Sequence, residues 1–300
     1  MADADVDELI RTIHRLVVED TEGWSPVRLP NISSGVRRLI EPLAVNRDIP
    51  ARLAPGPAAE DQRPLIRRGM TALVEECATN LEADGQHPGG RESAILSMSV
   101  NGAYAEQAMP RLLQKLLPEG GAEQLGHAPE PPMVGDGAAA RSLAVSISAR
   151  TGRGEGDVLR TLAGAGWGGA GPVAADMLVR AAMGSTALSP KDQEAVTELV
   201  AGRLEKAFAD RGPGRDEWDA RGERRDSIDR GADAVEVASV TAEQEVQRCR
   251  ARAGASVAHI LDPQLSPTPG SQGANAPQTA EQPARPAGPR GAGPPERNER

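Results

Sequence analysis

Large apolar side chains are scarce in this chain, and their scarcity limits how much of it can fold around one core. Leu, Ile, Val and Phe together number 55 of 300 residues, about 18%, and alanine supplies most of the remaining apolar content. A share below about 20% is typical of chains with long disordered parts. The five aromatic residues are Trp24, Tyr104, Trp167, Phe208 and Trp218. We therefore expect one modest helical domain with poorly ordered flanks.

The net charge of −9 disfavours a protein that binds nucleic acid, because phosphate neutralisation needs clustered Lys and Arg. The chain has no run of 18 apolar residues, so we predict no transmembrane segment. Its acidic amino terminus lacks the basic segment and apolar run of a cleaved signal peptide. Cys77 and Cys249 lie far apart, and the four histidines lack metal-ligand spacing. We expect no disulfide framework and no metal site.

Apolar spacing and proline content divide the chain into four parts. The first combines a short amphipathic helix with a Pro-rich stretch that we expect to be extended and poorly ordered. The second carries apolar stripes at helical spacing, the third a mixed-charge linker and a marginal helix, and the fourth a disordered Pro-rich tail. These parts are residues 1–62, 63–212, 213–261 and 262–300.

The fold class that we predict is an all-α helical bundle, with its core at about residues 90–212 and an extension back to 63. Pro64 predicts a helix start, because proline lacks the N–H that the first helical turn leaves unpaired. Ser189, Pro190 and Asp192 form a second start signature, in which the serine caps the new helix.

Gly164, Gly166 and Gly169 match the spacing of a dinucleotide-binding fingerprint. The residues before them do not predict a buried strand, and no acidic residue follows about twenty positions later to bind a ribose. We therefore reject a nucleotide-binding fold.

The residues around Gly152 resemble a helix-turn-helix unit, in which a tight turn orients a second helix toward the major groove of DNA. Arg150, Arg153 and Arg160 would contact phosphate in such a complex. A DNA-binding regulator is therefore an alternative function, although the overall charge and Asp157 on the second helix oppose it.

Three segments occur in a fixed order on this helical background. Residues 106–113 are Glu-Gln-Ala-Met-Pro-Arg-Leu-Leu, residues 135–143 are Gly-Asp-Gly-Ala-Ala-Ala-Arg-Ser-Leu, and residues 166–171 are Gly-Trp-Gly-Gly-Ala-Gly. Together they resemble the RhoGAP domain of bacterial type III secreted effectors, the YopE, ExoS and SptP family. That family has a Gln-Ala-Leu-Pro helix, a Gly-x-Leu-Arg loop and a Gln-Trp-Gly-Thr-x-Gly-Gly segment in the same order. The resemblance covers about residues 90–210.

The resemblance implies that Arg141 is a catalytic arginine finger on an exposed loop, with Gly137 and Ser142 beside it in the loop. Trp167 would anchor packing under the loop, and Arg160 is a second candidate for the finger. An arginine supplied in trans stabilises the charge that develops on the γ-phosphate when a GTPase hydrolyses GTP. The protein would need no cofactor of its own, because GTP and Mg²⁺ belong to the partner GTPase.

The resemblance also implies partners and a location. The partners would be host Rho, Rac or Cdc42-type GTPases, and the effect would be disruption of the actin cytoskeleton. Residues 1–62 would bind a type III secretion chaperone or contact a membrane peripherally, and the secreted protein would act in the host cell cytosol. Because Ala140 replaces the family's Leu before the finger, a non-catalytic helical interaction module is a further alternative.

Overall fold

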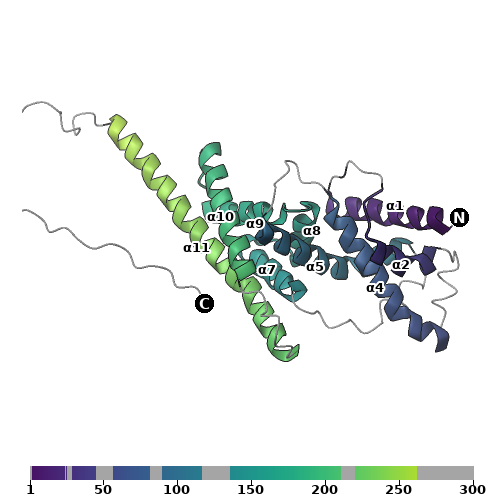
Figure 1. Cartoon of the computed structure of the whole chain (residues 1–300). Helices are drawn as coiled ribbons and strands as arrows, with labels where there is room; N and C mark the ends of the chain where they lie inside the picture. Colours follow the sequence, from purple (N-terminus) through teal and green to yellow (C-terminus); the bar gives the residue numbers. More distant parts are fainter. Residues whose placement is uncertain are drawn as a thin grey trace, which may run out of the picture. The chain divides into compact units, whose positions relative to one another are not determined.

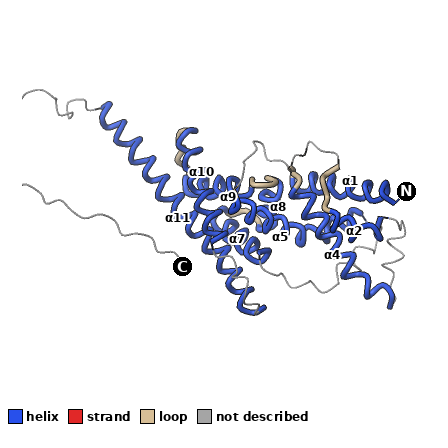
Figure 2. Tube along the Cα trace, in the orientation of Figure 1, coloured by secondary structure: helices blue, strands red, loops and turns tan. Residues whose placement is uncertain are grey.

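The computed structural model describes residues 2–23, 25, 29–44, 57–81, 90–116, 136–210 and 220–261. These described residues form helices and no strands, which confirms the predicted all-α class (Figures 1 and 2). The chain divides into two compact units, Met1–Gly254 and Ala255–Arg300, and the contacts described below lie within the first. The helices are α1 (Ala2–Thr21), α2 (Ser34–Ala44), α4 (Pro57–Thr79), α5 (Arg91–Leu116), α7 (Asp136–Thr151), α8 (Glu155–Gly164), α9 (Ala170–Met183), α10 (Pro190–Asp210) and α11 (Ala220–Leu261).

Helix α5 is the centre of the core. It contacts α1, α4, α7, α8, α9 and α10. Tyr104 is completely buried on it, but many of its other buried residues are small. Ser93, Ser97, Ala103, Ala105 and Ala108 let neighbouring helices approach closely, so the core fills without many large apolar side chains.

The short amphipathic helix that we predicted at the amino terminus is present as α1, but it belongs to this core, whereas we expected residues 1–62 to be a poorly ordered region outside the bundle. The apolar stripe of this helix consists of Val6, Ile10, Ile13 and Val17, and it is fully or almost fully buried. Helix α1 contacts α2, α4 and α8. A short helix gains most of its stability from tertiary packing, and α1 finds its packing partners in the same chain.

A second difference is helix α2, which lies inside the stretch that we expected to be extended. Its residues Val36 and Ile40 are buried, as is Ile32 just before it. The backbone N–H of Ser33 donates to the Glu76 carboxylate on α4 over 2.7 Å, and this contact ties the start of α2 to the bundle. Residues 57–62, which we also expected to be extended, belong to α4, and residues 24, 26–28 and 45–56 of the stretch lie outside the described residues.

Of the two predicted helix starts, the one at Ser189 is confirmed and the one at Pro64 is wrong. Ser189 caps α10, because its Oγ accepts a hydrogen bond from the Asp192 N–H over 3.1 Å and donates to the Asp192 carboxylate over 2.6 Å. Pro64 does not begin a helix, since α4 already starts at Pro57.

We predicted a mixed-charge linker and a marginal helix over residues 213–261, but the described part is one long helix, α11 (Ala220–Leu261), and residues 213–219 lie outside the described residues. Its buried face consists mainly of small side chains, which explains why the apolar signal is weak in the sequence. A side chain at Gly231 would clash with the Ala139 carbonyl of α7, so the two helices approach very closely there. The buried residues of α11 include Ala234, Val235, Ala238, Ala242, Val246 and Cys249. The predicted disordered tail at 262–300 lies outside the described residues.

Candidate functional site

Arg141 lies within helix α7, not in the loop that we predicted. The helix begins at Asp136 and therefore includes both Gly137 and Ser142. Three consecutive alanines, 138–140, precede the arginine and are buried in the core. Alanine is the strongest helix former, and burial of these methyl groups adds to the stability of the helix. The expected flexible loop around Arg141 is therefore wrong, and the residue has a rigid helical base.

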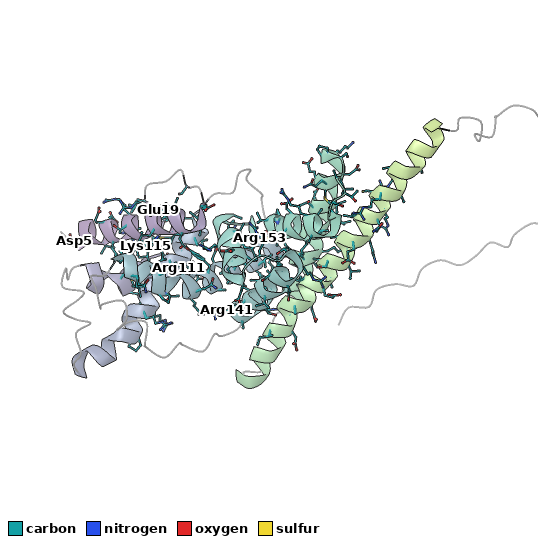
Figure 3. All side chains as sticks on the ribbon, turned by 180° about the vertical axis from the view of Figure 1, so that it is seen from behind. Asp5, Glu19, Arg111, Lys115, Arg141 and Arg153 are labelled. Carbon is teal, nitrogen blue, oxygen red and sulfur yellow. The ribbon has the colours of Figure 1, made fainter. Side chains whose placement is uncertain are left out.

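The Arg141 side chain bridges two of the three segments that carry the resemblance. Its Nη2 donates to the Glu106 carboxylate on α5 over 3.1 Å, and both side chains are about 30% exposed. The Arg141 Nε is buried and has no hydrogen-bond partner among the described residues. One edge of the guanidinium is therefore held by α5, and the side chain remains partly accessible to solvent. Figure 3 labels Arg141 on this part of the bundle.

The Glu106 carboxylate is close enough to Glu75 on α4 to affect the ionisation of that carboxyl. Burial raises the pKa of Glu75 on α4 above its usual value, and the nearby charges of Glu76 and Glu106 raise it further. Arg141 partly neutralises this group of carboxylates through its contact with Glu106.

Trp167 lies in the turn between α8 and α9, where the residue is 44% exposed. This position contradicts its predicted role as a packing anchor beneath a finger loop. The turn is rigid, because the Gly168 N–H donates to Ser97 Oγ and Ser93 Oγ donates to the Gly168 carbonyl, both over 3.1 Å. Gly166 and Gly168 have φ values of 67° and 75°, a region that other residues rarely adopt.

The turn and Arg141 contact different parts of α5. Ser97 holds the turn and Glu106 holds Arg141, and nine residues separate them in the sequence. At 1.5 Å per residue, these two contacts lie about 13 Å apart along the helix axis. The structure therefore brings all three segments onto α5 but does not assemble them at one point.

Arg160, the second candidate for the finger, also pairs with a carboxylate. It lies on α8 and forms an ion pair with Asp157, one turn earlier on the same helix. Its Nε donates to the Gly156 carbonyl over 3.4 Å. Its side chain is 40% exposed, somewhat more than that of Arg141.

The helix-turn-helix geometry around Gly152 is present, since α7 ends at Thr151 and α8 begins at Glu155. Two of the three arginines proposed to contact DNA are paired with carboxylates, Arg160 with Asp157 and Arg150 with Glu236 of α11. Arg153 is exposed in the turn, well apart from Arg141 (Figure 3). Acidic side chains in the first turn of α8 would repel phosphate, so this geometry is unfavourable for binding DNA.

The sequence did not reveal a polar cluster that joins α1 to α5. Arg111 donates to both carboxylate oxygens of Asp20, over 2.8 and 2.6 Å, and the Tyr104 hydroxyl donates to the same carboxylate over 2.9 Å. Burial opposes ionisation of Asp20, but the hydrogen bonds and positive charges of its partners outweigh burial, so its pKa lies below the usual value. Arg111 and nearby Glu19 are labelled in Figure 3. Sequence patterns predict local neighbours and could not reveal a pair 91 residues apart.

Among the described residues, the other reactive groups do not form a second site. Burial raises the pKa of the Cys77 thiol well above its usual value, and the thiol is a weak nucleophile as a result. His14 is buried, and burial lowers its pKa. The described residues contain no group of His, Cys, Asp and Glu arranged to hold a metal ion. None of the described helices is both long and apolar enough to cross a membrane.

Comparison with known proteins identifies no relative. No protein-family model matches the chain, and the searches of curated proteins and of solved structures found no match to it. The segment before Gly164 is helix α8 and not a strand, in agreement with our rejection of the dinucleotide fingerprint.

Proposed function

We propose that this protein activates the GTPase activity of a Rho-family partner and that Arg141 is the residue it inserts. The observation that carries the proposal is the contact between Arg141 and Glu106. This contact joins the first two segments of the resemblance. Arg141 itself lies on helix α7, and its side chain is partly exposed.

The chemistry would require Arg141 to exchange one anionic partner for another. A guanidinium binds phosphate oxygens through two parallel hydrogen bonds, which the single donor group of lysine cannot reproduce. In the free protein Glu106 occupies one edge of that guanidinium. On docking, the γ-phosphate of GTP would take the place of the carboxylate. GTP and Mg²⁺ would come with the GTPase.

The energies of the two contacts favour this exchange. A partly exposed ion pair such as Arg141–Glu106 contributes about 0–1 kcal/mol to stability. An arginine finger accelerates hydrolysis by about 10³ to 10⁵, which corresponds to about 4–7 kcal/mol. Breaking the pair therefore costs much less than the transition state gains.

Single-turnover hydrolysis of GTP by purified Rho, Rac and Cdc42 proteins tests the proposal. We expect stimulation by the parent protein, at least a hundredfold less stimulation with Arg141→Ala, and little recovery with Arg141→Lys. Arg160→Ala is the matched control and should retain activity. Glu106→Gln should stimulate at least as well as the parent, because it releases the guanidinium.

Two results would contradict this assignment. If Arg160→Ala abolishes stimulation and Arg141→Ala does not, the finger lies on α8 instead. If the parent protein stimulates none of the GTPases, the activating function is wrong.

A non-catalytic interaction module is a second candidate function. The position of Arg141 inside α7 favours this function, because the ion pair with Glu106 keeps the side chain against α5 and away from a partner protein. Such a module would bind a GTPase in a pull-down assay and leave its rate of hydrolysis unchanged.

The proposal extends to delivery by a type III apparatus into the host cytosol, where a secretion chaperone would first bind residues 1–62. The apolar stripe of α1 is buried within the bundle. A chaperone that recognises this stripe would therefore have to bind before the bundle closes.

A further inference from the structure

Helix α1 carries two titratable side chains that are almost fully buried, His14 and Asp20. His14 is 5% exposed, and its Nε2 has no hydrogen-bond partner among the described residues. The Asp20 side chain is 7% exposed and accepts hydrogen bonds from Arg111 and Tyr104 on α5. A proton at His14 would add a positive charge inside the core, and a proton at Asp20 would remove the negative charge that Arg111 binds. Acid therefore opposes the packing of α1 at both positions.

Protonated His14 would have no counter-ion in the packed bundle. Burial is the cause of its lowered pKa, and no neighbouring charge among the described residues contributes to the change. The helices packed on α1 do carry charged side chains, but these already have partners. They include Arg37 of α2 with Asp7, Glu76 of α4 with Ser33, Arg111 of α5 with Asp20, and Arg160 of α8 with Asp157. A new charge on His14 would therefore be buried without compensation.

His14 responds to acid in a higher range of pH than Asp20. Burial lowers the pKa of His14 below its ordinary value of 6.5. A released α1 takes up this proton more readily than the packed helix, so the stability from neutral His14 is fully present above pH 6.5 and is lost as the pH falls toward the folded-state value. Burial opposes ionisation of Asp20, but its hydrogen bonds keep its pKa below 3.8. In mildly acidic solution His14 is therefore the group that responds.

The contact between α4 and α5 responds to acid in the opposite sense. Burial raises the pKa of Glu75 above its ordinary value of 4.5, and the charges of Glu76 and Glu106 raise it further. A Cβ at Gly102 of α5 would lie 3.8 Å from the Glu75 carboxyl carbon, so this unfavourable charge faces the central helix. Protonation of Glu75 removes the charge and stabilises the contact as the pH falls through the raised value. Mild acid therefore weakens the packing of α1 and not that of the bundle centre.

We propose that α1 is an acid-released helix, in which protonation of His14 shifts the equilibrium from the packed to the released form while α4 and α5 stay folded together. Release exposes the apolar stripe of Val6, Ile10, Ile13 and Val17, whose burial keeps α1 packed at neutral pH. His14 and the stripe are separate from the Arg141–Glu106 contact, so the device does not depend on activation of a GTPase.

Hydrogen–deuterium exchange of the full chain, followed by mass spectrometry of its peptides, tests the proposal at pH 7.5 and pH 5.0. Protection is compared after correction for the intrinsic exchange rate at each pH. We expect the opening equilibrium constant of α1 to rise at least about fivefold and at most about 30-fold at pH 5.0, the upper limit being full protonation of the released form alone. The opening constant of α5 should not rise by a comparable factor.

Variants assign the response to His14. His14→Phe fills the same buried space without a titratable group, so the ratio of the α1 opening constants at the two pH values should fall close to one, whatever their absolute size. His14→Gln should give the same ratio and serves if His14→Phe does not fold. Asp20→Asn should raise opening of α1 at both pH values and leave the ratio unchanged. His259→Gln is the matched control, because His259 belongs to the second compact unit, and it should behave like the parent.

Circular dichroism of each variant at both pH values checks that the bundle remains helical. The proposal is overturned if the parent shows the same opening of α1 at pH 7.5 and pH 5.0. It is equally overturned if the foldable His14 variants retain the parent's ratio. A loss of protection in α5 as large as that in α1 would also overturn it, because the whole bundle would then open together.

Discussion

At the scale of single residues, Asp20 makes the clearest contribution to stability. Its side chain is 7% exposed, and it receives hydrogen bonds from both Arg111 and Tyr104. These contacts link α1 to α5 across 84 and 91 residues of sequence. Loss of the carboxylate would leave the Arg111 guanidinium without its acceptor. Removing one partner of such an ion pair destabilises a protein more than replacing both partners does.

We therefore expect Asp20→Asn to lower the free energy of unfolding by about 2–3 kcal/mol at pH 7. The pKa of Asp20 is lowered in the folded state, so its contribution is fully present above its ordinary pKa of 3.8 and is lost as the pH falls through the folded-state value. Urea denaturation at pH 7 and pH 3 measures both effects. The parent should lose more stability on acidification than the variant.

Glu8→Gln is the matched control for this prediction. Glu8 pairs with Arg11 on the exposed face of α1, where the two side chains are 69% and 46% exposed. We expect a change within about 0.5 kcal/mol. Equal effects of the two substitutions would mean that the Asp20 cluster contributes no more than a surface pair.

At the scale of helices, the close approach of α7 and α11 at Gly231 dictates which side chains can occupy that position. Gly231→Val would place a branched side chain against the Ala139 carbonyl and force the two helices apart. We expect a loss of about 2–4 kcal/mol in the free energy of unfolding, which thermal denaturation measures. Gly202→Ala on α10 has open space and should stabilise the protein by about 0.5–1 kcal/mol. Similar melting temperatures for Gly231→Val and the parent would contradict the close approach.

Helices whose sequence signal is local could be predicted, and the helix that packs through small residues could not. The stripe from Val6 to Val17 predicted α1, and Ser189 predicted the start of α10, because each signal is local. Helix α11 was underestimated because its contacts use Gly and Ala, which give little hydrophobic periodicity.

The candidate site was predicted only in part, for a related reason. The order of the three segments made Arg141 a candidate but did not predict that it lies inside α7. We assigned the alanines before it to a loop, although alanine strongly favours a helix. The Glu106 contact depends on how α5 and α7 pack, which no local pattern contains. The exposure of Trp167 likewise follows from the two glycine conformations beside it and from the serines of α5.

At the scale of the whole molecule, the core does not begin at residue 63 or 90. Helices α1, α2 and α4 pack on one another, and α1 and α4 also contact α5. A protein that starts at α5 would expose the apolar surfaces that α1 and α4 cover. The smallest stable domain therefore includes the amino-terminal helices.

Limited proteolysis with mass spectrometry tests this boundary. We expect a protected fragment that begins before residue 22 and extends beyond residue 210, because α1 and α10 both contribute buried residues to one core. A protein lacking residues 1–62 should unfold at a lower temperature than the full chain. A compact, protease-resistant fragment beginning near residue 90 would contradict the prediction.

The small buried side chains of α5 also affect how stability changes with temperature. The heat capacity of unfolding grows with the apolar area that becomes exposed and falls with the polar area. When the bundle unfolds, the serine and alanine side chains at its centre expose little apolar area compared with the polar backbone that is exposed with them. The stability curve of this protein should therefore be flatter than that of a bundle packed with Leu and Phe. Its free energy of unfolding would then change little between cold and warm surroundings.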